Sequence, residues 1–135
     1  ELGVIELIAL FHDIGKTKEL STFPENDYTD EGQLLGHIII GVEMIGEAIR
    51  GIEGFPEKIA NELKHCILAH HGELEFGSPK KPALVEALCL SFADNLDAKM
   101  ETMKEIFNGV PENNLEWQGY NRLLESNIRR TSSDK

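Results

Sequence analysis

At residues 10–16 the chain reads Leu-Phe-His-Asp-Ile-Gly-Lys, which places a histidine beside an aspartate where an apolar segment ends at a glycine. Adjacent His12 and Asp13 side chains can bind one divalent cation through a nitrogen and an oxygen, and a carboxylate can bridge two cations. A purely structural pair, an aspartate that caps a helix beside an amphipathic histidine, is the alternative. The same ligand types recur downstream at His37, His70, His71 and Asp94. This order of ligands predicts a metal centre.

Apolar residues recur at helical spacing along most of the chain, which predicts an all-α protein. The expected helices cover residues 2–13, 31–50, 56–71 and 82–108, and a shorter fifth helix lies within 110–135. The first is apolar almost all round and is expected to be central. Segments 17–30 and 73–81 hold proline, glycine, serine and threonine residues and are expected to be loops. We therefore expect a compact bundle of about five helices, without β-strands.

A length of 135 residues fits one domain with a single core, and no repeat or linker divides the sequence. We place the core in residues 1–109 and a partly helical C-terminal extension in residues 110–135. Residues 129–135 are expected to form a frayed tail. The first residue is Glu1 and not methionine, so we expect a fragment of a longer protein.

The net charge of −11 excludes a basic nucleic-acid-binding surface, because an acidic surface repels phosphate backbones. Two bound divalent cations would add four positive charges, so such a protein can still process phosphate esters at its metal centre. No apolar run approaches the roughly 20 residues of a membrane span, and the N-terminus lacks the features of a signal peptide. We expect a cytoplasmic protein that does not contact membranes.

The downstream histidines differ in how strongly they indicate metal binding. His37 lies on an apolar face between Gly36 and Ile38, where a lone histidine is more often a hydrogen-bonded core residue than a ligand. The pair His70 and His71 is stronger, because two adjacent imidazoles are costly to bury unless something satisfies them. His65 is expected to lie on a helix surface, outside the site.

The remaining candidates are charged. Asp94 lies within an apolar stripe, where a carboxylate needs a partner. Asp97 shares that helix face at i+3 and is a secondary candidate, although a salt bridge with Lys99 or Lys104 would also explain it. Lys16 is either a contact for a substrate phosphate or an ordinary exposed lysine.

Taken together, these residues resemble the HD superfamily of metal-dependent phosphohydrolases, and more closely the HD domain of the YhaM-type 3′→5′ exoribonucleases. The matching stretches are residues 12–16, 28–37, 69–73, 76–80 and 93–100. The His-Asp element is shared across the superfamily. The resemblance to the YhaM-type HD domain rests on two further stretches, the Gly-Ser-Pro sequence at 77–79 and the Asp-Asn-Leu-Asp-Ala-Lys sequence at 94–99.

This resemblance implies which residues bind metal and which are catalytic. One metal would be held by His12, Asp13 and Asp94; the remaining histidines, His37, His70 and His71, would hold a second metal or position the phosphate. Asp13 and Lys16 would be catalytic, since Asp13 bridges the cations and orients the attacking water while Lys16 contacts the phosphate. The cofactor would be one or two divalent ions among Mn, Fe, Co, Mg and Zn, with Mn favoured.

The implied substrate is a phosphate ester, either the 3′ end of single-stranded RNA or DNA, from which nucleoside monophosphates are released, or a nucleotide. The family carries a further histidine on a helix upstream of His-Asp, and no histidine precedes His12 here. We expect that ligand, and an upstream OB-fold that grips single strands, to lie outside this chain, which would then bind metal weakly and show little activity. Two alternatives are a stand-alone phosphohydrolase acting on a nucleotide or cyclic dinucleotide, and a non-catalytic binding module. The sequence does not predict the oligomeric state.

Overall fold

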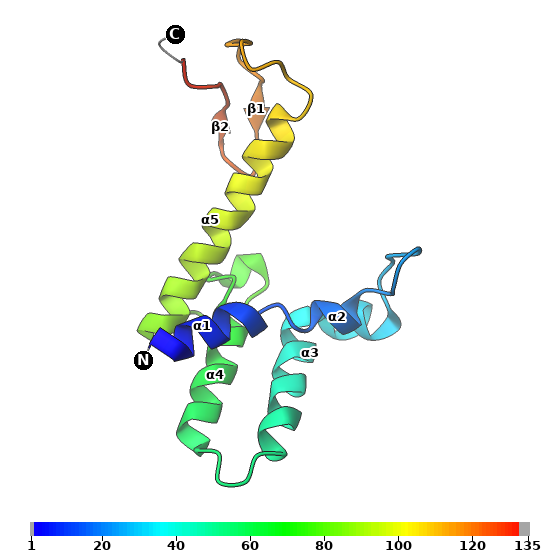
Figure 1. The fold of residues 1–135 in the computed structure, drawn as a ribbon, viewed down its shortest axis with the longest axis vertical. Coiled ribbons are helices and arrows are strands. Elements are labelled where there is room, and N and C mark those ends of the chain that lie inside the picture. The colour runs from blue at the N-terminus through cyan, green and yellow to red at the C-terminus, as the bar shows by residue number, and fades with distance from the viewer. Residues whose placement is uncertain (1, 133–135) are drawn as a thin grey trace. The chain divides into compact units, whose positions relative to one another are not determined.

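The computed structural model describes residues 2–132, and helices dominate it (Figure 1). The α-helices in this range are α1 (Leu2–Phe11), α2 (Lys16–Glu19), α3 (Asp30–Arg50), α4 (Glu57–Ala69) and α5 (Val85–Phe107), and a 3-10 turn, η1 (Leu74–Phe76), lies between α4 and α5. The predicted all-α class with about five helices is confirmed. Internal contacts divide the chain into two compact units, residues 1–94 and 95–135.

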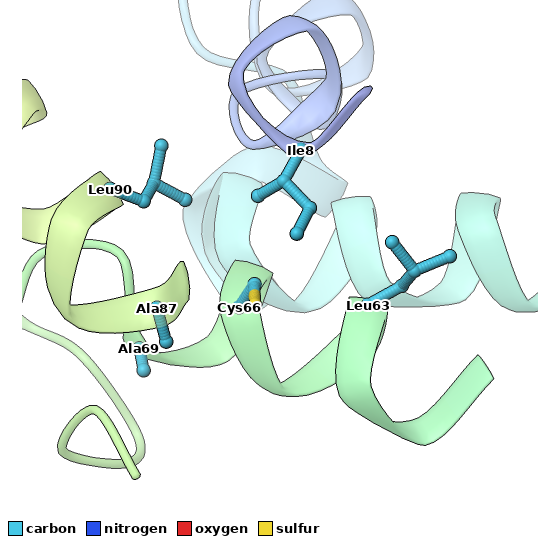
Figure 2. Packing of buried hydrophobic residues seen from close by; sticks show 6 residues of the cluster. All are labelled: Ile8, Leu63, Cys66, Ala69, Ala87 and Leu90. Atoms are coloured by element: carbon cyan, nitrogen blue, oxygen red, sulfur yellow. The ribbon is translucent and has the colours of Figure 1, made fainter. Parts of the chain in front are cut away.

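The core of the first unit is a cluster of small and branched apolar side chains, which Figure 2 shows. Its members are Ile8 from α1, Leu63, Cys66 and Ala69 from α4, and Ala87 and Leu90 from α5. Ala69 and Ala87 are both fully buried, and their small size lets α4 and the start of α5 pack closely. His70 directly follows Ala69, and Asp94 lies four residues after Leu90 on the same helix face. Core packing therefore positions two of the predicted ligands.

Helix α1 is not central, contrary to the prediction from its apolar sequence. Ile8 is buried, whereas Leu7 and Leu10 are 43% and 75% exposed. Ile8 packs in the core cluster and Phe11 is half-buried, whereas Leu7, Ala9 and Leu10 remain exposed. Composition alone therefore overestimated how deeply this helix is buried.

The turn after α1 lies directly on the backbone of α3. A Cβ atom at Gly15 would overlap the carbonyl of His37, and a Cβ at Gly41 would lie 3.5 Å from the Gly15 nitrogen. Two glycines at one crossing bring the two backbones within contact distance. The short helix α2 begins just after this crossing, within a segment predicted to be a loop. As a result, the His-Asp turn lies next to the middle of α3.

Helix α3 begins as predicted and then changes direction. The Thr29 hydroxyl caps it by accepting a hydrogen bond from the Gly32 N–H at 2.9 Å. Gly36 has φ of 72° and ψ of 158°, a non-helical conformation that glycine adopts without a steric penalty. The break directly precedes His37, so the second half of α3 begins at a predicted ligand.

By length and composition, α3 could also cross a membrane, in contrast to the expectation that no segment could. This is weak evidence, because the core helix of a soluble protein passes the same test. Here the helix contacts α2 and α4 and buries Ile38 and Ile40. Packing within the protein therefore accounts for part of its apolar composition, since 28% of the apolar window is buried.

Within residues 110–132, the structure does not contain the predicted C-terminal helix. Instead, β1 (Tyr120–Asn121) pairs antiparallel with β2 (Ser126–Asn127), so the expectation of no β-strand was also wrong. Gly119 has φ of 94° and Glu125 has φ of 50°, which favours a tight hairpin over a helix.

The tail after β2 is partly held in place. The Arg130 guanidinium donates to the carbonyls of Phe107 and Val110 at 3.3 and 3.0 Å and lies 4.4 Å from the centroid of the Phe107 ring. The frayed tail predicted for 129–135 is therefore wrong at Arg130, and residues 133–135 lie outside the described residues.

Candidate metal centre

Four of the five histidines converge in the first unit, and each has a hydrogen-bond partner at Nδ1. The partners are the carbonyl of Ala9 for His12 at 2.8 Å, the carboxylate of Glu19 for His37 at 3.3 Å, the carbonyl of Ile67 for His70 at 2.6 Å and the carbonyl of Phe76 for His71 at 2.8 Å. An oxygen acceptor at each Nδ1 favours the tautomer with its proton there. All four Nε2 lone pairs are then free to bind a cation.

The ligand atoms form two groups, and within each group they lie within 4.8 Å of one another. One group is His12, Asp13 and Asp94; the other is His37, His70 and His71. The sequence singled out all six of these residues, and the structure brings all six together. His65 belongs to neither group, since its Nε2 accepts a hydrogen bond from the Ala83 N–H at 2.9 Å, and Asp97 is exposed outside both.

The Asp13 carboxylate lies between the two groups. Its Oδ1 is 3.6 Å from His37 Nε2 and 3.7 Å from His70 Nε2, and its Oδ2 is 3.4 Å from His12 Nε2. These separations are too long for good hydrogen bonds, but a cation about 2.0–2.2 Å from each atom would fit between them. Asp13 is therefore the carboxylate that both groups could share if each held a cation.

Buried polar atoms without a hydrogen-bond partner also indicate a cation site. Within the described residues, Asp13 Oδ1, His37 Nε2 and His70 Nε2 are buried without a hydrogen-bond partner. Leaving such atoms unpaired is costly, so three of them facing one another need an explanation. A divalent cation would satisfy all three atoms, and the mixed imidazole and carboxylate donors suit first-row metals.

Electrostatics prepares most of these groups to bind a cation. Burial lowers the pKa of His70 to about 4, so its imidazole is neutral at neutral pH. The His12 imidazole lowers the pKa of the Asp94 carboxyl below its usual range, against burial. Burial favours a higher pKa for Asp13, but the Lys16 ammonium and the nearby imidazoles lower it overall. The Asp94 carboxylate raises the pKa of His12, so this imidazole keeps its proton to a higher pH, and a cation would have to displace that proton to bind.

The buried His70 gives a pH-dependent prediction for the metal-free protein. The pKa of His70 is about 4 in the folded chain and 6.5 for a histidine without these contacts, as in the unfolded chain. The unfolded chain therefore binds the proton more tightly. The free energy of unfolding should therefore fall as pH decreases from 6.5 towards 4.5, by about 2 to 3 kcal/mol. His12 acts in the opposite direction, because a raised pKa stabilises the folded state at low pH. Urea unfolding in the presence of chelator, measured for the wild type and for His70→Gln over this pH range, isolates the contribution of His70. If the free energy of unfolding changed equally with pH in the two proteins, the prediction would be contradicted.

Glu19 is a site residue that the sequence reasoning missed. Its side chain is 8% exposed, and its Oε1 accepts hydrogen bonds from the His37 N–H at 3.0 Å and from His37 Nδ1 at 3.3 Å. A carboxylate behind a ligating histidine fixes the ring and increases its basicity. In the sequence, Glu19 is one of several charged residues in a predicted loop, and nothing in that segment shows what its side chain faces.

We expect Glu19→Gln to weaken metal binding about 10- to 100-fold, because the amide is a poorer acceptor for the Nδ1 proton of His37. Isothermal titration with Mn²⁺ measures the change. Glu47→Gln, at an exposed position of α3, is the matched control and should bind metal like the wild type. Equal affinities for the two variants would show that Glu19 does not act on His37.

His71 is positioned by the loop after α4. The Ser78 hydroxyl, in a side chain only 3% exposed, accepts a hydrogen bond from the His71 N–H at 3.1 Å. Gly77 adopts a left-handed conformation with φ of 91°, which turns the chain back towards His71. The loop thus holds His71 at its backbone through the Ser78 hydroxyl and at its ring through the Phe76 carbonyl.

Lys16 lies at the edge of the cluster. Its Nζ donates to Asp13 Oδ2 at 2.7 Å, and its side chain is 48% exposed. The ammonium can therefore reach both the bridging carboxylate and a ligand that approaches from solvent.

Comparison with known families agrees with this geometry. The family model described as "HD domain" matches residues 1–99. This chain belongs to the HD domain family. HD domains bind divalent metals, and the two ligand groups of this HD domain could hold such ions.

Within the HD domain family, the chain is similar to a group of exoribonucleases. The chain is 49% identical over 101 residues to the 3′-5′ exoribonuclease YhaM of Bacillus velezensis, 48% over 101 residues to that of Bacillus subtilis and 51% over 103 residues to that of Halalkalibacterium halodurans. Each match covers 75% of this chain but only 31–32% of the relative, so the chain spans about a third of the length of those proteins. No solved structure matches the chain.

Proposed function

We propose that this HD domain is the catalytic part of a metal-dependent 3′→5′ exoribonuclease, which releases nucleoside monophosphates from single-stranded RNA or DNA. The observation that carries the proposal is the pair of ligand groups on either side of the Asp13 carboxylate. Sites with two cations hydrolyse phosphate esters in many unrelated enzymes. The relatives are named 3′-5′ exoribonucleases, and this supports both the direction of attack and the nucleic acid substrate.

The chain's own residues suit this reaction. Cations held by the two groups would polarise the phosphate and lower the pKa of a water molecule. Asp13, whose pKa is below its usual range, is a carboxylate at neutral pH and would orient the attacking water by accepting a hydrogen bond. The Lys16 ammonium would donate to a phosphoryl oxygen, where negative charge increases in the transition state.

We propose manganese as the native ion, because mixed imidazole and carboxylate ligands suit Mn²⁺, and Fe, Co, Mg and Zn as competitors. An OB-fold outside this chain would hold the single strand, since the surface here has a net charge of −11 and repels a phosphate backbone. A cytoplasmic location is part of the same proposal.

The test uses RNA of about ten nucleotides with a 5′ label, incubated with Mn²⁺ or with chelator. The protein is a version of the chain extended upstream to include the family's further histidine, because the chain alone is expected to show little activity. We expect a ladder of products shortened from the 3′ end, release of nucleoside 5′-monophosphates and no reaction in chelator. A duplex with blunt ends should be degraded more slowly, because the terminal nucleotide is then paired. Elemental analysis of the same preparation gives the metal content.

Other outcomes would change the assignment. Hydrolysis of free nucleotides or cyclic dinucleotides without RNA shortening would favour a stand-alone phosphohydrolase. Metal binding without hydrolysis of any of these substrates would favour a binding module.

A further inference from the structure

An open cavity of about 360 Å³ adjoins the candidate metal centre. Its wall on that side is made of His37 and His71, whose ring centroids are 5.2 Å apart. The rest of the lining is mostly apolar and includes Leu35, Ile39, Phe76 and Pro79. The volume lies within the range of about 300–1,000 Å³ that holds small ligands. A group attached to a phosphate at the metal centre would therefore meet an apolar surface in this cavity.

Phe76 is the residue that gives the cavity its chemistry. Its side chain is 60% exposed although it is a large aromatic residue, and Leu35 beside the same cavity is 45% exposed. The backbone of Phe76 is nevertheless fixed, because its N–H donates to the Glu73 carbonyl at 3.1 Å and its carbonyl accepts from His71 Nδ1 at 2.8 Å. An exposed ring on a fixed backbone, tied to a candidate metal ligand, is a suitable platform for a planar group.

We propose that this cavity binds the terminal nucleobase of a single-stranded substrate and that Phe76 stacks on its face. This inference rests on the proposed exonuclease function, which places the scissile phosphate at the neighbouring cations. Stacking on aromatic side chains is a common way to hold unpaired bases without reading their sequence. It also suits a chain with a net charge of −11, which gains little from contacts to the phosphate backbone.

The lining predicts which feature of the base is recognised. Apart from the two imidazoles, which face the cations, the named side chains of the cavity are apolar. Hydrogen-bonding groups on the base edge therefore contribute little, and the flat aromatic face contributes most. The four bases should be removed at similar rates, whereas a terminal nucleotide with a non-planar base should be a poor substrate.

The experiment compares two RNAs that differ only in the 3′-terminal base, uridine or 5,6-dihydrouridine. The second keeps the hydrogen-bonding groups but loses the flat aromatic ring. With Mn²⁺ and wild-type protein, we expect KM for the dihydrouridine substrate to be about 5- to 100-fold higher, with a similar kcat. Phe76→Ala should raise KM for the uridine substrate to that level, and Phe76→Trp should preserve the wild-type preference.

Phe23→Ala is the matched control, because Phe23 is 84% exposed and lies outside the cavity lining. It should behave like the wild type with both RNAs. RNA shortening with equal KM values for the two substrates, or no effect of Phe76→Ala, would overturn the stacking proposal and leave the exonuclease function intact.

A binding measurement separates the two proposals when no hydrolysis is seen. The fluorescence of 2-aminopurine riboside 5′-monophosphate is quenched when its base stacks, and this requires no turnover. Quenching by the wild type and by Phe23→Ala, but not by Phe76→Ala, would support the base site even if the exonuclease function fails. No quenching by the wild type, together with no hydrolysis, would overturn both.

Discussion

Asp13→Asn is expected to remove bound metal and to reduce turnover by more than the 10- to 100-fold that the loss of a supporting residue typically costs. The side chain keeps its shape but loses its charge and one acceptor oxygen. Asp13 faces three histidines, at 3.4 Å from His12, 3.6 Å from His37 and 3.7 Å from His70. Among the described residues, Asp94 pairs only with His12 and Glu19 only with His37, so Asp13 is the one carboxylate within 4 Å of histidines from both ligand groups. Elemental analysis and RNA shortening with Mn²⁺ measure the two effects.

The control for this variant is Asp97→Asn. Asp97 lies one helical turn from Asp94 but is exposed and outside both ligand groups. Its replacement should leave metal content and turnover unchanged. Thermal unfolding in chelator should place Asp13→Asn within a few degrees of the wild type, because no core contact is lost. Full metal content in Asp13→Asn would show that the carboxylate is not a ligand.

Gly15→Ala is expected to lower the free energy of unfolding by about 3 kcal/mol or more, at the upper end of what overpacking costs. The added Cβ would overlap the backbone carbonyl of His37, and a backbone cannot move aside as a flexible side chain can. The melting temperature should fall by about 10 °C. Metal binding should weaken as well, because this crossing holds the His-Asp turn against α3. Differential scanning calorimetry and Mn²⁺ titration measure the two changes.

Gly46→Ala, in helix α3, is the matched control. Its Cβ would meet the end of the Lys64 side chain at 3.3 Å, which can move, and alanine favours a helix over glycine by about 1 kcal/mol. This variant should be as stable as the wild type or more so. A loss of stability in Gly46→Ala as large as in Gly15→Ala would show that the effect does not come from the backbone crossing.

The helix positions were predictable from local patterns. Apolar spacing located α3 and α4 to within one or two residues, and Thr29 marked the start of α3. These signals are local because a helix is stabilised by contacts between residues three or four apart. Segments without such periodicity were misjudged: the loop before α3 contains α2, and the hairpin at Tyr120 was taken for a helix.

The sequence by itself determined the all-α class and the identities of the six candidate ligands, because rare residue types such as adjacent His12 and Asp13 stand out without any knowledge of the fold. Only the tertiary structure decided how these residues are used. The pairing of His37 with Glu19, the position of Asp13 between two groups and the cavity beside Phe76 depend on residues that are distant in the chain. Such contacts are set by the packing of α1, α3 and α4 and by the close crossing at Gly15, and no local pattern encodes them.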